Sequence, residues 1–387
     1  MSWMAKPAAS GKAACARVMG RRAFCGLALT AGGAALLGLA GCGQQESSTP
    51  ADEGTVQQDS SEQSQESSAS SADEAAATSS DPVKASTFAF NTLVNITAYD
   101  VDESVVSECI KACSTYEDLF SARKEGTDVA RINGAAGQPV EVSADTADLL
   151  ACALDYGRQT DGAFDVTIGS VSLLWDFVEG VKPDDDAIAE GLKHIDYTQV
   201  GLDGTTVTMG DAQAKLDLGG IAKGWIAARL AERLGEAGCT SALIDLGTSS
   251  VYALGAKPDG TDWRVGLRDP ADSMSSLTGV VGIADEAITS SGLYDQKFEQ
   301  DGVTYWHILD PKTGYPVQTD MLGVTLIGTD PVQGDALSTT VSVMGIERAS
   351  AWIQQNHPDL AAMFVDQSDN ATFVNDFESH GYTAIES

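Results

Sequence analysis

Three strand-like runs, SALIDLG, SVYALG and WRVGLRDP, follow one another closely between residues 241 and 270. Only turns separate these runs, and a turn is too short for the helical crossover that a parallel pair of strands requires. The sequence therefore predicts meandering, antiparallel strands in this region. Further strands and helices follow one another elsewhere without regular alternation, a pattern that favours an α+β fold.

The remaining elements are predicted from hydrophobic spacing and from capping residues. A helix is expected over the segment SADTADLLACALDYGRQTDG, with Ser143 or Asp145 as its cap and an end near Gly162. The other expected helices span residues 102–119, 221–234, 331–344 and 346–357, and the other expected strands span residues 87–100, 214–218 and 323–330.

The first 41 residues resemble an export segment. Residues 1–23 carry five cations and no acid, and the charge-free stretch that follows is too short for a confident membrane span of about 20 mostly apolar residues. The run LAGC ends at Cys42 and resembles the lipobox of bacterial lipoproteins. We therefore expect a signal peptide over residues 1–41, with cleavage and lipidation at Cys42. GRRAFCG also resembles a twin-arginine signal without its usual Lys, so the export route stays open.

Residues 42–85 are dominated by Ser, Ala, Gln and acids, and Val56 and Val83 are the only large aliphatic residues among them. Such a segment cannot bury enough apolar surface to offset the entropy of ordering. We expect a disordered tether here and a folded domain over residues 86–387. The protein would thus be exported and held at the outer face of the cell membrane by a lipid anchor only.

The chain is strongly acidic, with a net charge of −33. Loss of the signal peptide would leave 18 Lys and Arg against 56 Asp and Glu, a net charge of −38. This charge disfavours nucleic acid and anionic lipid as partners. An anionic ligand would need a metal ion or helix-terminal amides.

Five of the seven cysteines follow the predicted cleavage point, with no C-x-x-C pair and no zinc-type spacing. Cys109 and Cys113 share one face of an expected helix, which favours core thiols over a redox pair.

The segment TDPVQGDALSTTVSVMG places Asp335, Ser338 and Thr339 at i, i+3 and i+4 of a helix that begins near Pro331. A carboxylate and two hydroxyls are hard oxygen donors, which suit Mg²⁺ together with phosphate oxygens and water. On spacing alone, a solvated polar helix face explains the same residues.

A candidate anion site lies in LDLGGIAKGW, where Asp217 ends a strand, two glycines allow close approach and Lys223 adds a cation. A tight turn with Asp217 as a cap explains this segment equally well.

Aromatic residues suggest where a planar ring could bind. Trp175 and Phe177 flank Asp176, an arrangement that could stack a ring and receive its polar edge, although core packing explains it too. The small-residue stretch Ser290 to Gly292 lacks the G-x-S-x-G pattern of a reactive serine, and we interpret it as phosphate-lining or structural.

His307 lies in YWHILDPKTGYP, at the point where an aromatic strand is expected to give way to a turn. Asp310 is expected to shape that turn or to orient His307.

These segments, in this order along the chain, resemble the ApbE family of FAD:protein FMN transferases, from about Phe90 to Gly345 and onward to the end. The resemblance implies an α+β, T-fold-like domain of mixed and antiparallel sheets with packed helices. It also implies Mg²⁺-dependent transfer of FMN from FAD to a Ser or Thr hydroxyl of an exported acceptor protein, through a phosphoester bond, with release of AMP.

Carried over residue by residue, the resemblance makes His307 a catalytic residue. It implies metal ligands at Gly220, Asp335, Ser338 and Thr339, and flavin-dinucleotide contacts at Phe90, Trp175, Asp176, Phe177, Asp217, Lys223 and the backbone of Leu309. Asn91 stands where the family usually has Gly, and Asn tolerates the left-handed backbone region.

Two alternative functions use the same residues. Water in place of the acceptor hydroxyl would give an FAD pyrophosphatase, and binding without turnover would give a flavin-binding surface lipoprotein.

Overall fold

The computed structural model describes residues 81–247, 249–270, 276–293 and 296–385. The predicted signal peptide, the lipidation site Cys42 and nearly all of the tether lie outside these residues. The first strand begins at Val83, where Val83 pairs with Ala98, so regular structure starts three residues before the expected boundary at residue 86. No helix in the described part of the chain is long and apolar enough to cross a membrane.

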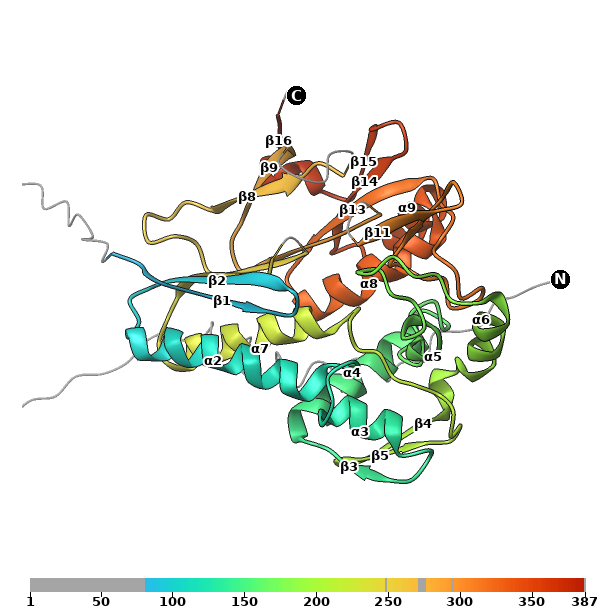
Figure 1. Ribbon diagram of the computed structural model, residues 1–387. Helices are drawn as coiled ribbons and strands as arrows, with labels where there is room; N and C mark the ends of the chain where they lie inside the picture. Colours follow the sequence, from blue (N-terminus) through green and yellow to red (C-terminus); the bar gives the residue numbers. More distant parts are fainter. Residues whose placement is uncertain (1–80, 248, 271–275, 294–295, 386–387) are drawn as a thin grey trace, which may run out of the picture. The chain divides into compact units, whose positions relative to one another are not determined.

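An eight-stranded sheet forms the centre of the domain (Figure 1), and every pair of neighbouring strands in it is antiparallel. The α+β fold class is therefore confirmed. In sheet order, its strands are β1 (Val83–Ala89), β2 (Thr92–Tyr99), β6 (Ser241–Asp245), β7 (Ser250–Leu254), β10 (Ala287–Gly292), β13 (Met321–Gly328), β14 (Ala361–Asp366) and β15 (Ala371–Val374).

The prediction of a single strand over residues 87–100 is wrong, because the chain reverses direction between β1 and β2. Phe90 and Asn91 have φ values of 55° and 58°, and they form the two-residue turn that joins β1 to β2. Such a turn needs positive φ at both positions and matches the twist of the flanking strands. Asn91 adopts the left-handed conformation that we expected of it.

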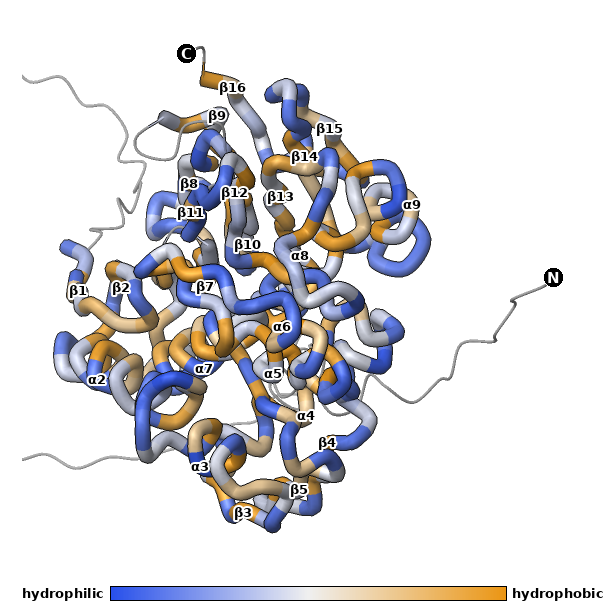
Figure 2. The backbone as a smooth tube through the Cα atoms, turned by 45° about the vertical axis from the view of Figure 1, so that its right-hand side comes forward, coloured by the Kyte–Doolittle hydropathy of each residue, from blue (hydrophilic) through white to orange (hydrophobic). Residues whose placement is uncertain are grey.

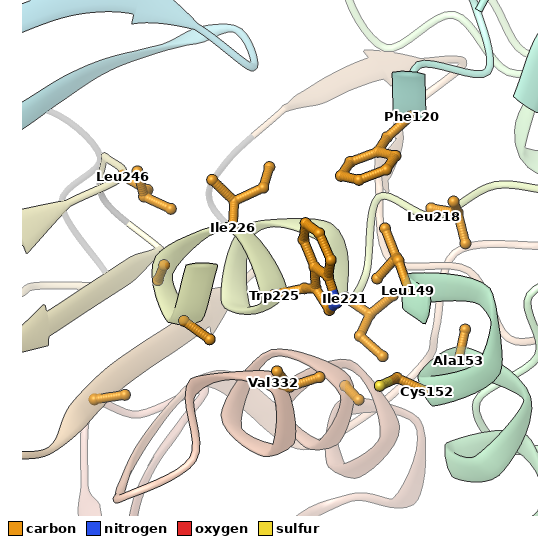
Figure 3. Packing of buried hydrophobic residues seen from close by; sticks show 14 of the residues in the cluster. Phe120, Leu149, Cys152, Ala153, Leu218, Ile221, Trp225, Ile226, Leu246 and Val332 are labelled. Carbon is orange, nitrogen blue, oxygen red and sulfur yellow. The ribbon is translucent and has the colours of Figure 1, made fainter. Parts of the chain in front are cut away.

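Three helices cover one face of this sheet: α2 (Glu103–Phe120), α7 (Ala222–Glu236) and α8 (Pro331–Met344) (Figure 1). Strand alternation points Ile96 and Ile244 toward these helices, and both side chains are fully buried. Trp225 of α7 fills the centre of this core, with its ring centroid 5.4 Å from that of Phe120 at nearly a right angle (Figure 3). The apolar stretches that build this core appear in orange along the strands and helices in Figure 2.

The opposite face of the large sheet packs against a three-stranded sheet of order β16-β9-β8, through a second buried cluster that contains Ile288 and Val281. Its strands are β8 (Trp263–Arg268), β9 (Leu277–Ile283) and β16 (Thr383–Ala384). The prediction that the runs SALIDLG, SVYALG and WRVGLRDP form one continuous meander is therefore wrong for the third run, which is β8. β6 and β7 do pair directly, whereas β8 leaves the large sheet and pairs with β9.

The strand expected over residues 214–218 is absent, and the reason is a side chain far away in the sequence. Asn133 receives the Leu216 N–H on its Oδ1 at 2.7 Å and donates its Nδ2 to the Leu216 carbonyl at 2.9 Å. The amide thus takes the backbone groups that a strand partner would use. Lys215 alone forms an isolated bridge, with Ile168.

The other expected helices are present with small differences at their ends. Ser143 caps α4 by accepting the Thr146 N–H at 3.1 Å, which decides between the two predicted caps. The remaining elements are α3 (Asp128–Gly134), α4 (Ala144–Gln159), α5 (Gly169–Ser172), α6 (Asp185–Gly191), α9 (Ile346–Asn356), the small sheet of β3 (Val140–Glu141), β4 (Val200–Asp203) and β5 (Thr206–Met209), and the hairpin of β11 (Lys297–Gln300) and β12 (Val303–Trp306).

Cys109 and Cys113 are fully buried free thiols on the inner face of α2, as expected of core residues. Burial raises the pKa of each thiol to about 11. Both side chains are therefore neutral and unreactive at physiological pH.

Candidate functional site

The contact between α7 and α8 brings the two most informative sequence segments together. A Cβ atom on Gly224 would lie only 2.1 Å from the Pro331 carbonyl oxygen and 2.9 Å from Asp335 Cβ, so this approach requires glycine. The Gly224 N–H donates to Oδ2 of Asp335 at 2.8 Å. The glycine-rich turn and the helix of residues 331–344 thus form one site.

Gly220 and Thr339 meet at the same contact. A Cβ atom on Gly220 would lie 3.4 Å from the Thr339 hydroxyl oxygen, so the backbone at residue 220 lies close to this half-buried side chain. Three of the four residues implied as metal ligands, Gly220, Asp335 and Thr339, are therefore neighbours.

Ser338 is placed differently from Thr339, and its role as a metal ligand stays a prediction. Its side chain is fully buried, its hydroxyl donates to the Asp335 carbonyl at 2.9 Å, and it accepts the Ser291 hydroxyl at 2.9 Å. Ser338 joins α8 to the end of β10, and Ser291 has the structural role that we had left open.

Asp335 is a carboxylate in an unfavourable environment for its charge. Burial raises its pKa, while the Lys223 ammonium and the backbone N–H groups of Gly224 and Lys223 act in the opposite direction. A buried carboxylate of this kind is stabilised by a cation.

The oxygen atoms at this site suit Mg²⁺. Asp335 offers a carboxylate, Thr339 a hydroxyl and Gly220 a backbone carbonyl. Within the described residues, no three His, Cys, Asp or Glu side chains gather as a metal group, so phosphate and water oxygens would have to complete the coordination. Mg²⁺ is commonly held in this way, by one or two protein carboxylates and a phosphate substrate.

Lys223 projects from the first turn of α7 and donates from Nζ to the Ser249 hydroxyl. Ser249 lies in the loop between β6 and β7, and sequence reasoning did not identify it as a partner of Lys223. The Lys223 ammonium also lowers the pKa of Asp335 through its charge. The same side chain therefore contacts Ser249 and interacts with the candidate metal site.

Asp217 caps the turn that precedes α7, as one of its two interpretations predicted. Oδ1 accepts the Gly219 N–H at 2.9 Å, and Oδ2 accepts the Ser172 hydroxyl at 2.6 Å. Ser172 was missed because no sequence signal links two residues 45 positions apart. A flavin contact for Asp217 stays a prediction.

Trp175 belongs to the core, which favours core packing over ring stacking, the two interpretations left open by the sequence; a flavin contact for Trp175 stays a prediction. Its side chain has no exposed surface, its ring is stacked on Phe177 at 5.5 Å, and its Nε1 donates to the Gly314 carbonyl at 3.2 Å. Asp176 Oδ1 accepts the N–H groups of Val178 and Glu179 and thereby shapes the following turn. Phe177 is partly exposed at the edge of this cluster.

His307 follows β12 directly and is half-buried, as expected of a residue at the junction of strand and turn. Its neighbour Ile308 packs in one cluster with Val343 of α8, which lies one helical turn beyond Thr339. Asp310 shapes the turn, because its Oδ1 accepts the Lys312 N–H at 2.8 Å and its backbone carbonyl accepts the Gly314 N–H.

Leu309 and Phe90, the last two predicted flavin contacts, lie on separate segments of the chain. Leu309 is buried and its backbone forms a bridge with Pro316. Phe90 donates its N–H to Glu117 at 2.8 Å at the turn between β1 and β2. This turn lies at the same end of the sheet as Gly247, since a Cβ atom there would meet Thr92 Oγ1 at 2.0 Å.

Comparison with known proteins gives one consistent result. Residues 90–364 match the ApbE family. The FAD:protein FMN transferase of Klebsiella pneumoniae (strain 342) is 36% identical over 272 residues, covering 69% of this chain and 84% of that protein. The FAD:protein FMN transferase of Treponema pallidum (strain Nichols) is 34% identical over 280 residues, covering 68% of this chain and 77% of that protein.

Solved structures agree with the sequence matches. The ApbE protein of Thermotoga maritima superposes with a TM-score of 0.71 at 29% identity, covering 77% of this chain and 99% of that one. The flavin transferase ApbE of Vibrio cholerae gives a TM-score of 0.69 at 26% identity, covering 78% of this chain and 99% of that one. The chain thus has the ApbE-like fold that we expected, and it belongs to the ApbE family.

Proposed function

We propose that this chain is an Mg²⁺-dependent FAD:protein FMN transferase. The observation that carries the proposal is the convergence of Gly220, Lys223, Asp335 and Thr339 at the contact between α7 and α8. Two relatives, which are 34% and 36% identical to this chain, are named FAD:protein FMN transferase. FAD would be the substrate, and Asp335, Thr339 and the Gly220 carbonyl would hold the metal.

Mg²⁺ bound there would neutralise charge on the diphosphate, which a protein with a net charge of −33 otherwise repels. Lys223 supplies a second positive charge at the same place. The helix N-terminus of α7 adds backbone N–H groups. Together these groups would orient the diphosphate and favour the charge that develops during transfer.

The reaction is a substitution at phosphorus. The oxygen of an acceptor Ser or Thr hydroxyl forms a bond with the phosphorus of the FMN half, and the bond from this phosphorus to the bridging oxygen breaks. AMP leaves with that oxygen, and His307 accepts the hydroxyl proton and passes it to solvent or to AMP. A general base of this kind contributes about 10²- to 10⁴-fold to the rate.

The site of action follows from the N-terminal sequence. A signal peptide over residues 1–41 and lipidation at Cys42 would place the domain at the outer face of the membrane. The acceptor must then be an exported flavoprotein, since it has to meet the enzyme on that side.

The test is incubation of the mature protein with FAD, Mg²⁺ and a fraction of exported proteins, followed by mass spectrometry for FMN on Ser or Thr. AMP and free FMN without labelled protein would identify a pyrophosphatase instead. Tight FAD binding without AMP, indifferent to Mg²⁺, would identify a flavin-binding lipoprotein.

Asp335→Asn should abolish transfer, because it removes the carboxylate charge but keeps the shape of the side chain. Asp330→Asn is the matched control: Asp330 is a part-buried carboxyl at the N-cap of α8, where it accepts the Val332 N–H at 2.9 Å, a role that Asn fills. Full activity of Asp335→Asn, or transfer at full rate in excess chelator, would refute the metal assignment.

A further inference from the structure

We propose that an extended segment of the acceptor protein binds in a groove between β8 and the large sheet, pairs with the outer edge of β8 along residues 264–267, and thereby presents its hydroxyl residue at the loop between β6 and β7. This inference rests on the proposed function and adds to it the place where the protein substrate docks.

The groove has a volume of about 560 Å³, which lies within the range of pockets that bind ligands specifically. One wall consists of the consecutive residues Arg264–Arg268 of β8. In the described part of the chain, β8 pairs only with β9, so its other edge faces the groove. An edge strand presents a row of backbone donors and acceptors, and an extended polypeptide satisfies these groups by adding a strand.

The other wall is the face of the large sheet that points away from the helices. Asn95 and Asp245 lie side by side on it, and Asn95 Nδ2 donates to Asp245 Oδ2 at 3.1 Å. Ser290 lies on the same wall, within hydrogen-bonding distance of Thr325 at 3.0 Å. These polar groups can receive the side chains of a bound strand, which alternate between its two faces.

The groove extends to the candidate catalytic site. Asp245, Gly247 and Ser250 line it, and Ser249 of the same loop accepts a hydrogen bond from Lys223. The loop between β6 and β7 therefore contacts the groove on one side and the predicted diphosphate cation on the other. A segment bound along β8 would bring its side chains to this loop without a rearrangement of the fold.

The mouth of the groove carries large apolar side chains in contact with solvent. Leu93 and Leu277 line the groove and are 54% and 40% exposed. Phe88, which is 73% exposed, pairs with Leu93 across the β1–β2 hairpin. Adjacent exposed apolar residues at the rim of a groove are typical of a surface that binds another protein. A folded acceptor whose flavin-bearing segment enters the groove would cover this rim.

The first test leaves the enzyme unchanged. The probe is a short synthetic peptide with the sequence of the labelled segment found by mass spectrometry, and a series of peptides carries one N-methylated amide each. Because only every second residue of a strand bonds to a given neighbour, N-methylation at alternate positions should lower transfer at least about tenfold, while the positions between are tolerated.

The second test changes the rim and uses the intact acceptor. Leu93→Lys should raise KM for the acceptor about tenfold or more, as loss of an interface anchor does, with FAD binding unchanged. Val303→Lys is the matched control, since Val303 is 46% exposed but lies on the β11–β12 hairpin and does not line the groove.

Failure of docking is distinguishable from failure of the proposed function. If the wild-type enzyme labels no protein, the proposed function itself is wrong. If it labels the acceptor, the docking proposal is overturned by any one of three results: an unreactive peptide, tolerance of N-methylation at every position, or a wild-type KM for Leu93→Lys.

Discussion

Replacement of Gly224 by Ala tests the contact on which the site depends. The added methyl group would lie 2.1 Å from the Pro331 carbonyl oxygen, 2.8 Å from its carbonyl carbon and 2.9 Å from Asp335 Cβ. Two of these atoms belong to the backbone of α8, so a change of rotamer cannot relieve the overlap. The helices must separate, and the hydrogen bond from Gly224 to Asp335 must lengthen.

The magnitude follows from two opposing effects. Overpacking of a close contact costs about 1–3 kcal/mol. Because the Cβ atom would overlap backbone atoms of Pro331, which cannot move aside, we expect a cost near 3 kcal/mol here. Alanine is favoured over glycine inside a helix by about 1 kcal/mol. We therefore expect Gly224→Ala to lower the free energy of unfolding by about 2 kcal/mol. FMN transfer should fall at the same time, with a higher Mg²⁺ requirement, because Asp335 moves.

The assay is urea denaturation, with Mg²⁺ titrations of FMN transfer on the same samples. Gly134→Ala is the control, since Gly134 lies at the end of α3 and an added Cβ atom there has nothing within 4 Å. It should be neutral or slightly stabilising. A Gly224→Ala protein as stable as the wild type would refute the packing argument, and a destabilised one with an unchanged Mg²⁺ requirement would refute the link between this contact and the metal.

Three further predictions test separate parts of the structure. Thr339→Ala should raise the Mg²⁺ concentration needed for transfer with little effect on stability. Ser338→Ala should instead cost about 1–3 kcal/mol in urea denaturation, because it leaves the Ser291 hydroxyl without its partner. The opposite pattern would identify Ser338 rather than Thr339 as the ligand. The hydrogen bond that the His380 ring donates to the Glu286 carboxylate raises the pKa of His380, so this pair stabilises the fold fully below about pH 6 and loses its effect as pH rises through the raised pKa. The difference in unfolding free energy between wild type and Glu286→Gln should accordingly shrink from pH 6 to pH 8.5, and a constant difference would contradict the assignment. Asn91→Val should cost about 1–2 kcal/mol in thermal or urea unfolding and Asn91→Gly much less, because position 91 has a positive φ; equal effects would contradict the turn.

Local signals in the sequence predicted the helices and the residues at the contact between α7 and α8. Capping residues and apolar spacing are properties of a few adjacent positions, so the helix of residues 331–344 was predicted with its start at Pro331. Spacing alone did not show which hydroxyl faces Gly220, since Ser338 and Thr339 differ by about 100° around the helix axis and the packing of the helix decides its rotation.

Long-range pairing accounts for the features that the sequence did not show. The Asn133 amide binds Leu216 across 83 residues, and β8 pairs with β9 rather than β7, although all three strands have similar patterns. A strand pattern specifies which face is buried but does not specify its partner. The docking groove exists only because β8 leaves the large sheet, so no reading of the strands one by one would have found it.

In the proposed arrangement, the large sheet would also separate the two substrates. Strand alternation places Ile244 among the helices that carry Lys223 and Asp335, and it places Asp245 on the opposite face, in the groove. Flavin phosphate chemistry and acceptor recognition would thus lie on opposite faces of the sheet, and the loop after Asp245 touches both. Gly247 has a positive φ of 85°, and an added Cβ atom would lie 2.0 Å from Thr92 Oγ1, so a residue with a side chain would strain the backbone at this position.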